Sequence, residues 1–118
     1  MPALSIQVFG TKKHPDTRHA LRFFAERRIP VHFVDLAERA ASKGELTRFV
    51  QKFGVEALVD REGRRFAELG LGPARHGEER WLALLVEEPL LLRQPLVRHD
   101  KALSLGRDEA TWRAWTAK

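Results

Sequence analysis

The sequence predicts an α/β (α+β) fold: a four-stranded mixed sheet flanked by helices, with a helical insertion between strands two and three. Three observations predict it. Apolar alternation near residues 4–9 is followed by an amphipathic helical pattern and a second strand-like run, which is the order of a parallel crossover. Several helical patterns come next. Two short strand-like segments around a turn then indicate an antiparallel hairpin, and a last helical pattern follows it.

Each element is bounded by residues with known start or stop preferences. Pro15 suits a first helical turn, because the N–H that proline lacks is unsatisfied there anyway. Ser42 and Glu45 have the spacing of a capping box, and Gly54 is suited to end that helix. The predicted elements, in chain order, are a strand near residues 4–9, a helix from about Pro15 to Arg28, a strand from Val31 to about Leu36, a helix from Ser42 to Gly54, a short helical turn from Val55 to Val59, a polar Gly-rich segment over 60–78 held by Phe66, Leu69 and Leu71, a helix from Glu79 to Glu88, a hairpin of Pro95–His99 and Ala102–Leu105, and a helix capped by Asp108.

Composition limits the class of protein. The 118 residues are 43% apolar and 31% charged, which predicts a single globular domain over residues 1–118. No apolar run approaches the roughly 20 residues that a membrane helix needs, and the first residues lack the pattern of a secretory signal, so we expect a cytoplasmic protein that does not bind membranes. The absence of cysteine excludes disulfide bonds and thiol chemistry within this sequence. The net charge of +5 permits acidic partners, but the basic residues form no long block, which disfavours nucleic acid.

The segment between the first strand and the first helix is the most informative part of the chain. A strand, a short loop and a helix N-terminus together favour an anion, because backbone N–H groups and the helix dipole point at it. A thiolate at such a position is stabilised near neutral pH. Here the start of the helix carries His14, followed by Pro15.

Three stretches resemble the arsenate reductase family that includes ArsC and the Spx regulators. The first, Phe9–Ala20, resembles the aromatic residue, loop and Cys-x-x-Ser/Cys-Arg pattern of the family. The second is Phe66–Leu71, which a helix ending in Glu-Pro follows. The third is Leu90–Val97, after which Leu105–Arg107 precedes an acidic helix start. The order and spacing of the three stretches agree with the family, and the resemblance covers about residues 5 to 115. It implies a thioredoxin-like fold.

The resemblance also implies a site, and here the chain departs from it. In the reductases that this chain resembles, one Cys attacks arsenate and three Arg hold the oxyanion. His14 stands at the Cys position, Thr17 stands at the Ser or second Cys position, and Arg18 matches the Arg that follows. Arsenate reduction needs a sulfur that bonds to arsenic and is then resolved by another thiol. We therefore expect a cysteine-less, degenerate site with no catalytic residues and no reductase activity.

The oxyanion arginines are also altered. Arg107 matches one of the three. Gln94 replaces a second, with Arg93 one place early. The position of the third oxyanion arginine is occupied by Asp60, and Arg61 lies one residue after it. A carboxylate at this position would repel an oxyanion. A shift of one residue also turns a side chain to the other face of an extended segment.

These comparisons leave a small set of candidate residues. Pro95 matches the cis-proline of the family, and cis bonds are tolerated almost only before proline. Three interpretations of His14 stay open: an imidazole satisfied by backbone or water, part of a residual anion site, or a nucleophile or general base. The five histidines show no metal-ligand spacing, so we predict neither a metal nor a cofactor. The candidate anion ligands are Lys12, His14, Thr17, Arg18, Arg93 and Arg107.

Two functions of different classes follow from this set. The first is a protein-binding or regulatory module that resembles Spx in role and binds a partner through the surface around His14 or through the last helix. The alternative is an arsenate reductase-like oxidoreductase, or an oxyanion-binding enzyme, that uses an external thiol. A protein partner and a weak oxyanion ligand are the expected binding partners. Trp81, Trp112 and Trp115 are interpreted as core or interface residues.

Overall fold

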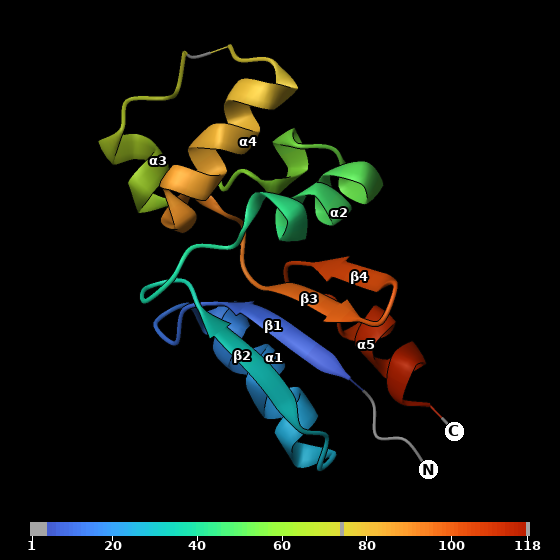
Figure 1. Cartoon of the computed structure of the whole chain (residues 1–118). Helices are drawn as coiled ribbons and strands as arrows, with labels where there is room; N and C mark the ends of the chain where they lie inside the picture. The colour runs from blue at the N-terminus through green and yellow to red at the C-terminus, as the bar shows by residue number, and fades with distance from the viewer. Residues whose placement is uncertain (1–4, 74, 118) are drawn as a thin grey trace. The chain divides into compact units, whose positions relative to one another are not determined.

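The computed structural model describes residues 5–73 and 75–117 (Figure 1). The described residues divide into two compact units, one running to Asp35 and resuming at Gln94, the other spanning Leu36–Arg93. A single domain over the whole chain stays a prediction. None of the described helices is long and apolar enough to span a membrane. The elements, in chain order, are β1 (Ile6–Gly10), α1 (Pro15–Glu26), β2 (Val31–Asp35), α2 (Lys43–Phe53), the 3-10 turn η1 (Glu56–Leu58), α3 (Arg64–Glu68), α4 (Glu78–Glu87), the 3-10 turn η2 (Pro89–Leu91), β3 (Leu96–His99), β4 (Ala102–Leu105) and α5 (Glu109–Thr116).

The sheet has four strands in the order β2-β1-β3-β4, which confirms the predicted mixed sheet. β1 pairs in parallel with β2, placing Val8 opposite Phe33, and antiparallel with β3, placing Val8 opposite Val97. β3 and β4 form the predicted hairpin, with Val97 opposite Ser104. Asp100 in its turn has a φ of 53°, the left-handed conformation that tight hairpin turns require.

Helices α1 and α5 pack on one face of the sheet (Figure 1). The Trp112 side chain is fully buried there, and its indole N–H donates to Ser104 Oγ at 2.8 Å, so this buried polar pair is satisfied. Trp115 is half-buried, with its ring centroid 5.6 Å from that of His99. The core of this unit consists of Ile6, Val8, Ala20, Phe23, Phe24, Val97 and Trp112.

Several predicted boundaries were wrong by one or two residues. α1 ends at Glu26 rather than Arg28, because Arg28 has a φ of 58°, which is not helical. β2 ends at Asp35 and does not include Leu36. Leu4, predicted to start the first strand, lies outside the described residues.

The unit spanning Leu36–Arg93 is the predicted helical insertion between the second and third strands. Trp81 on α4 is 1% exposed and belongs to its core. The helix α3 falls in the Gly-rich segment, where no helix was predicted. Its five residues are too few to show a helical period, and the side chain of only one of them, Phe66, is buried. The largest fully buried side chains of this unit are Leu46, Phe49, Leu58, Trp81, Leu85, Leu91 and Leu92.

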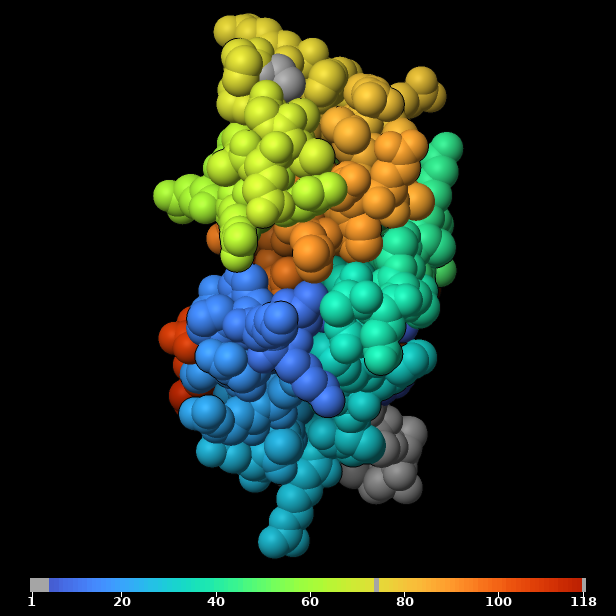
Figure 2. All heavy atoms as spheres, turned by 90° about the vertical axis from the view of Figure 1, so that its left-hand side faces the viewer, coloured from blue at the N-terminus to red at the C-terminus, as the bar shows by residue number. Residues whose placement is uncertain are grey.

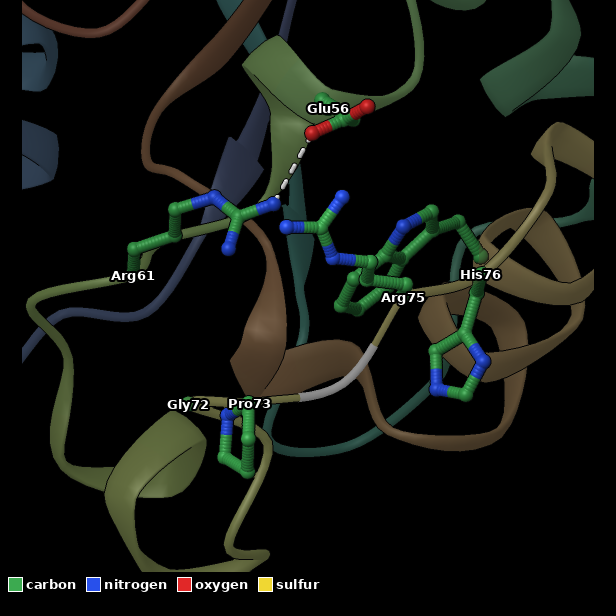
Figure 3. A pocket seen from close by; sticks show the side chains of 7 residues that line it. Glu56, Arg61, Gly72, Pro73, Arg75 and His76 are labelled. Atoms are coloured by element: carbon green, nitrogen blue, oxygen red, sulfur yellow. Dashed lines mark hydrogen bonds and ion pairs between the residues drawn. The ribbon is translucent and has the colours of Figure 1, made fainter.

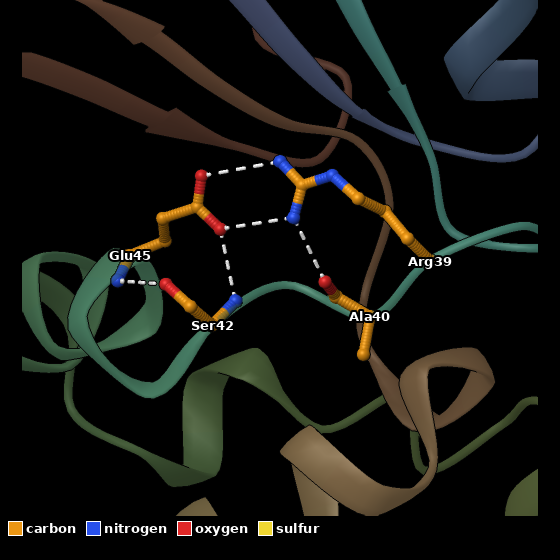
Figure 4. A network of polar contacts seen from close by, with 4 residues as sticks. All are labelled: Arg39, Ala40, Ser42 and Glu45. Carbon is orange, nitrogen blue, oxygen red and sulfur yellow. Dashed lines mark hydrogen bonds and ion pairs between the residues drawn. The ribbon is translucent and has the colours of Figure 1, made fainter.

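The predicted capping box at the start of α2 is confirmed (Figure 4). The Glu45 N–H donates to Ser42 Oγ at 3.1 Å, and the Ser42 N–H donates to Glu45 Oε1 at 2.9 Å. The Arg39 guanidinium lies 3.4 Å from each Glu45 carboxylate oxygen. Burial raises the pKa of Glu45, but the hydrogen bonds from Ser42 and Arg39 outweigh it and hold that pKa below its ordinary 4.5.

We expect Glu45→Gln to weaken the acid dependence of stability. A carboxyl group with a lowered pKa in the folded state stabilises the protein above its unfolded pKa, and this contribution is lost as the pH falls through the folded pKa. The variant should therefore be less stable than the parent at pH 7, by about 1 kcal/mol or less, and equally stable near pH 3. Urea unfolding across this range measures it. Glu62→Gln, an exposed control, should leave the profile unchanged.

Candidate functional site

The loop between β1 and α1 is held close to the segment that precedes β3. A Cβ atom at Gly10 would collide with the Thr17 hydroxyl and lie 3.1 Å from Gln94 Oε1, so this position requires glycine. The end of β1, the first turn of α1 and the chain before β3 therefore meet at one point within one unit.

Gln94 joins these three segments through its side-chain oxygen. Its Oε1 accepts hydrogen bonds from the Thr11 N–H at 2.6 Å, the Thr11 hydroxyl at 3.2 Å and the Thr17 hydroxyl at 3.1 Å. Gln94 is 6% exposed and Thr17 is fully buried. An arginine here could not accept any of these bonds, because a guanidinium has no acceptor. An arginine at this position would donate hydrogen bonds to a ligand. Gln94 instead accepts hydrogen bonds from the protein's own loop and helix.

Pro95 follows Gln94 through a cis peptide bond. Its side chain is buried, and its carbonyl accepts the Gly106 N–H at 2.9 Å, which ties this segment to the end of β4. Gln94 and Pro95 therefore offer little surface, and of the side chains beside them Lys12 is exposed and His14 is half-buried.

His14 is the N-cap of α1. Its Nδ1 accepts the Asp16 N–H at 3.1 Å, and its carbonyl accepts the Arg18 N–H at 3.0 Å. An accepting Nδ1 carries a lone pair, so a neutral ring holds its proton on Nε2. These bonds support the first interpretation of His14, an imidazole satisfied by the backbone. The bond to Nδ1 also occupies the Asp16 N–H, one of the free donors that an anion at this helix start would use.

Arg107 faces the same helix start and is already paired. Its Nε lies 3.3 Å from Asp16 Oδ1, with the two side chains 51% and 40% exposed. Such an exposed pair contributes at most about 1 kcal/mol, but an external anion would have to compete with it. Arg18 is exposed and donates to the Lys12 carbonyl at 3.4 Å, and the Lys12 ammonium lies 5.8 Å from the centre of the Phe33 ring.

The remaining candidates belong to the other unit. The Arg93 side chain is exposed, and the backbone N–H of Arg93 donates to the Leu58 carbonyl at 2.8 Å. Arg61 donates to Glu56 Oε1 at 2.9 Å. The structure therefore groups Lys12, His14, Thr17, Arg18 and Arg107 in one unit, and places Asp60, Arg61 and Arg93 in the other. Among the described residues, no group of three His, Asp or Glu side chains is placed to hold a metal ion.

Sequence reasoning missed three residues of this site. Thr11 donates to Gln94, Gly10 allows the close approach, and Asp16 pairs with Arg107. A signal was present for the first two, since a buried polar residue before a proline needs donors, and a Gly-Thr pair stands where β1 ends. Nothing in the local sequence indicates the pairing of Asp16 with Arg107.

Known proteins resemble this chain over most of its length. The ArsC family matches residues 9–115. An arsenate reductase of Rhizobium meliloti (strain 1021) is 25% identical over 96 residues, which is 80% of this chain and 69% of that protein. Two solved structures share the thioredoxin-like fold. An arsenate reductase from Vibrio cholerae has a TM-score of 0.80 and 24% identity, covering 93% of this chain and 96% of that one. An arsenate reductase (ArsC) related protein from Brucella melitensis has a TM-score of 0.71 and 20% identity, covering 100% and 99%. With the family matched over residues 9–115, the chain belongs to the ArsC family, as a member without cysteine.

Proposed function

We propose that this ArsC-family protein acts without reductase chemistry, as a cytoplasmic protein-binding or regulatory module. One observation carries the proposal: the loop that would hold a sulfur and an oxyanion is satisfied by the protein's own side chains. Gln94 accepts from Thr11 and Thr17, and His14 caps the helix in a chain that contains no cysteine. Such a site is built for rigidity rather than for turnover.

The distribution of charge supports a binding role for the unit that contains the sheet. Residues 1–35 and 94–118 carry 11 Lys and Arg against 6 Asp and Glu, a net charge of +5. Residues 36–93 carry 10 against 10, a net charge of zero. The entire excess of positive charge therefore belongs to one unit, which favours association with an acidic partner.

Part of this charge lies beside the degenerate site. We define the basic rim as Lys12, Lys13, Arg18 and Arg22, all of them exposed. The loop and α1, in blue shades, are exposed on the face that Figure 2 turns to the viewer. Arg18 and Arg22 are four residues apart and so share one side of α1. We propose that the partner is an acidic or flexible protein segment, which pairs with the rim and needs no thiol.

We expect charge reversal of the basic rim to weaken a specific partner contact. In-cell crosslinking followed by native purification should recover a partner with the parent chain and lose it with Lys12→Glu/Lys13→Glu. The matched control is Lys43→Glu/Arg48→Glu, which makes the same charge change on α2 and should retain the partner. With the purified partner, the rim variant should associate more slowly and with a weaker salt dependence.

Loss of the partner from both double variants would contradict a role for the rim. Recovery of no partner from the parent chain, together with a tight small-molecule ligand at the α1 start, would favour the oxyanion-binding enzyme with an external thiol. Any oxyanion bound there should be weak, with a Kd of about 1 mM or higher, because Asp16 already holds Arg107.

A further inference from the structure

A polar pocket lies within the unit spanning Leu36–Arg93, and Arg61, the arginine next to Asp60, is among its lining residues (Figure 3). Its volume is about 460 Å³, enough for a small organic molecule. It is formed by η1, the segment after it, residues 72, 73, 75 and 76 between α3 and α4, and the first turn of α4. Its lining residues are Glu56, Arg61, Gly72, Pro73, Arg75, His76 and Trp81.

Arg61 is fixed at one side of the pocket. Its Nη2 donates to Glu56 Oε1 at 2.9 Å. Its guanidinium carbon lies 5.7 Å from the centre of the Phe66 ring and 5.6 Å from that of Trp81, within the range of cation–π contacts. These contacts favour one orientation of the guanidinium before a ligand binds, so less side-chain entropy is lost on binding, although the exposed ion pair with Glu56 contributes at most about 1 kcal/mol.

Arg75 is a second guanidinium aimed into the same pocket. Figure 3 shows its guanidinium directed toward that of Arg61, with Glu56 above the two. The Arg75 side chain is exposed, and among residues 5–73 and 75–117 no carboxylate or carbonyl accepts a hydrogen bond from it. Two guanidinium groups thus converge where the lining provides one carboxylate, and that carboxylate is bonded to Arg61. An anion between them would relieve their repulsion.

His76 and Trp81 form a further wall. The two rings meet edge to face, with centroids 4.9 Å apart. Trp81 is almost fully buried, whereas His76 is half-buried, so Trp81 belongs to the core and His76 to the surface of this wall. Together with Pro73 these rings give the pocket an apolar surface beside its two cations.

We propose that this pocket binds the phosphate group of a small phosphate monoester. Arg61 and Arg75 approach from two directions, and each guanidinium offers a fork of N–H donors. A carboxylate has two oxygens in one plane and matches one fork, whereas a phosphate presents three acceptor oxygens and nearly two negative charges. The volume beyond the phosphate and the wall of His76 and Trp81 fit the organic part of an ester.

Titration with phenyl phosphate, inorganic phosphate and benzoate tests the site. The probes are the Arg75 Nε–H and the Trp81 indole N–H in nitrogen-15 NMR spectra of the full chain. Phenyl phosphate should shift both signals with a Kd of roughly 1 mM or lower, and benzoate should bind at least about tenfold more weakly. Phenyl phosphate tighter than inorganic phosphate identifies an ester as the ligand class, and equal affinity identifies free phosphate.

Arg75→Gln should weaken phenyl phosphate binding about tenfold or more, because it removes one fork without breaking a hydrogen bond or ion pair to the described residues. The matched control is Arg48→Gln, an exposed arginine on α2 that does not line the pocket. Arg61→Gln is a second variant and should act in the same direction. Unmoved signals, equal losses in Arg75→Gln and Arg48→Gln, or benzoate binding as tight as phenyl phosphate would each overturn the proposal.

Discussion

A His14→Cys variant will present a reactive thiol and will still not reduce arsenate. A cysteine at the N-cap of α1 receives the helix dipole and the Asp16 N–H that His14 now accepts, and both lower the pKa of a thiol. The oxyanion, however, finds neither of the two clamp positions of this unit, Gln94 and Arg107, open to it. Arg107 is paired with Asp16, and the Gln94 oxygen faces donors of the loop instead of a ligand.

The experiment separates thiol reactivity from catalysis. The labelling rate with a disulfide reagent at pH 7 should be higher for His14→Cys than for His32→Cys, a matched change at an exposed position of β2. Arsenate-dependent oxidation of glutathione, with and without glutaredoxin, should equal the blank for the parent and for both variants. Family-like turnover by His14→Cys would show that Gln94 and Asp16 do not block the site, and our account of them would be wrong.

Much of the fold could be predicted because its signals are local. Ser42 and Glu45 are three residues apart, and their capping box forms as their spacing indicates. Asp108 caps α5 through the Thr111 N–H at 3.2 Å, and the turn at Asp100 lies between two short apolar segments. Such features need only neighbours within a few residues. α3 was missed because five residues with one buried side chain carry no period to detect.

The site could be predicted only in part, because its contacts join distant residues. The position of His14 follows from the strand, loop and helix order, which is local. The role of Gln94 depends on Thr11 and Thr17, which lie 83 and 77 residues before it in the chain. The sequence shows only that Gln94 replaces an arginine of the family pattern. The structure shows that its side-chain oxygen accepts the hydrogen bonds of Thr11 and Thr17. A long-range acceptor of this kind has no spacing that a pattern could match.

We expect Gln94→Met to lower the free energy of unfolding by about 2 kcal/mol, measured by urea denaturation at pH 7. Methionine is close to glutamine in length, so little volume is lost, but it has no amide oxygen for the donors of Thr11 and Thr17. Leaving a buried donor unpaired costs more than the net value of the hydrogen bond that it made. Gln51→Met, at an exposed position of α2, should change stability by about 0.5 kcal/mol or less.

A double-mutant cycle with Thr17→Val separates this cause from a packing defect. Valine has nearly the shape of threonine and lacks the hydroxyl that donates to Gln94 Oε1 at 3.1 Å. In the double variant the Thr17 hydroxyl is no longer left unpaired, while the loss of the Thr11 bonds is common to both Gln94 variants, so the double variant should cost about 1 kcal/mol less than the sum of the two single changes. Additive losses would mean that Gln94 acts by filling space alone. Since Thr17 is fully buried, the cycle reports on the interior of the site and not on solvent contacts. A positive coupling would establish that Gln94, at a position where relatives of this chain are expected to hold an oxyanion, stabilises the fold through its hydrogen bond with Thr17.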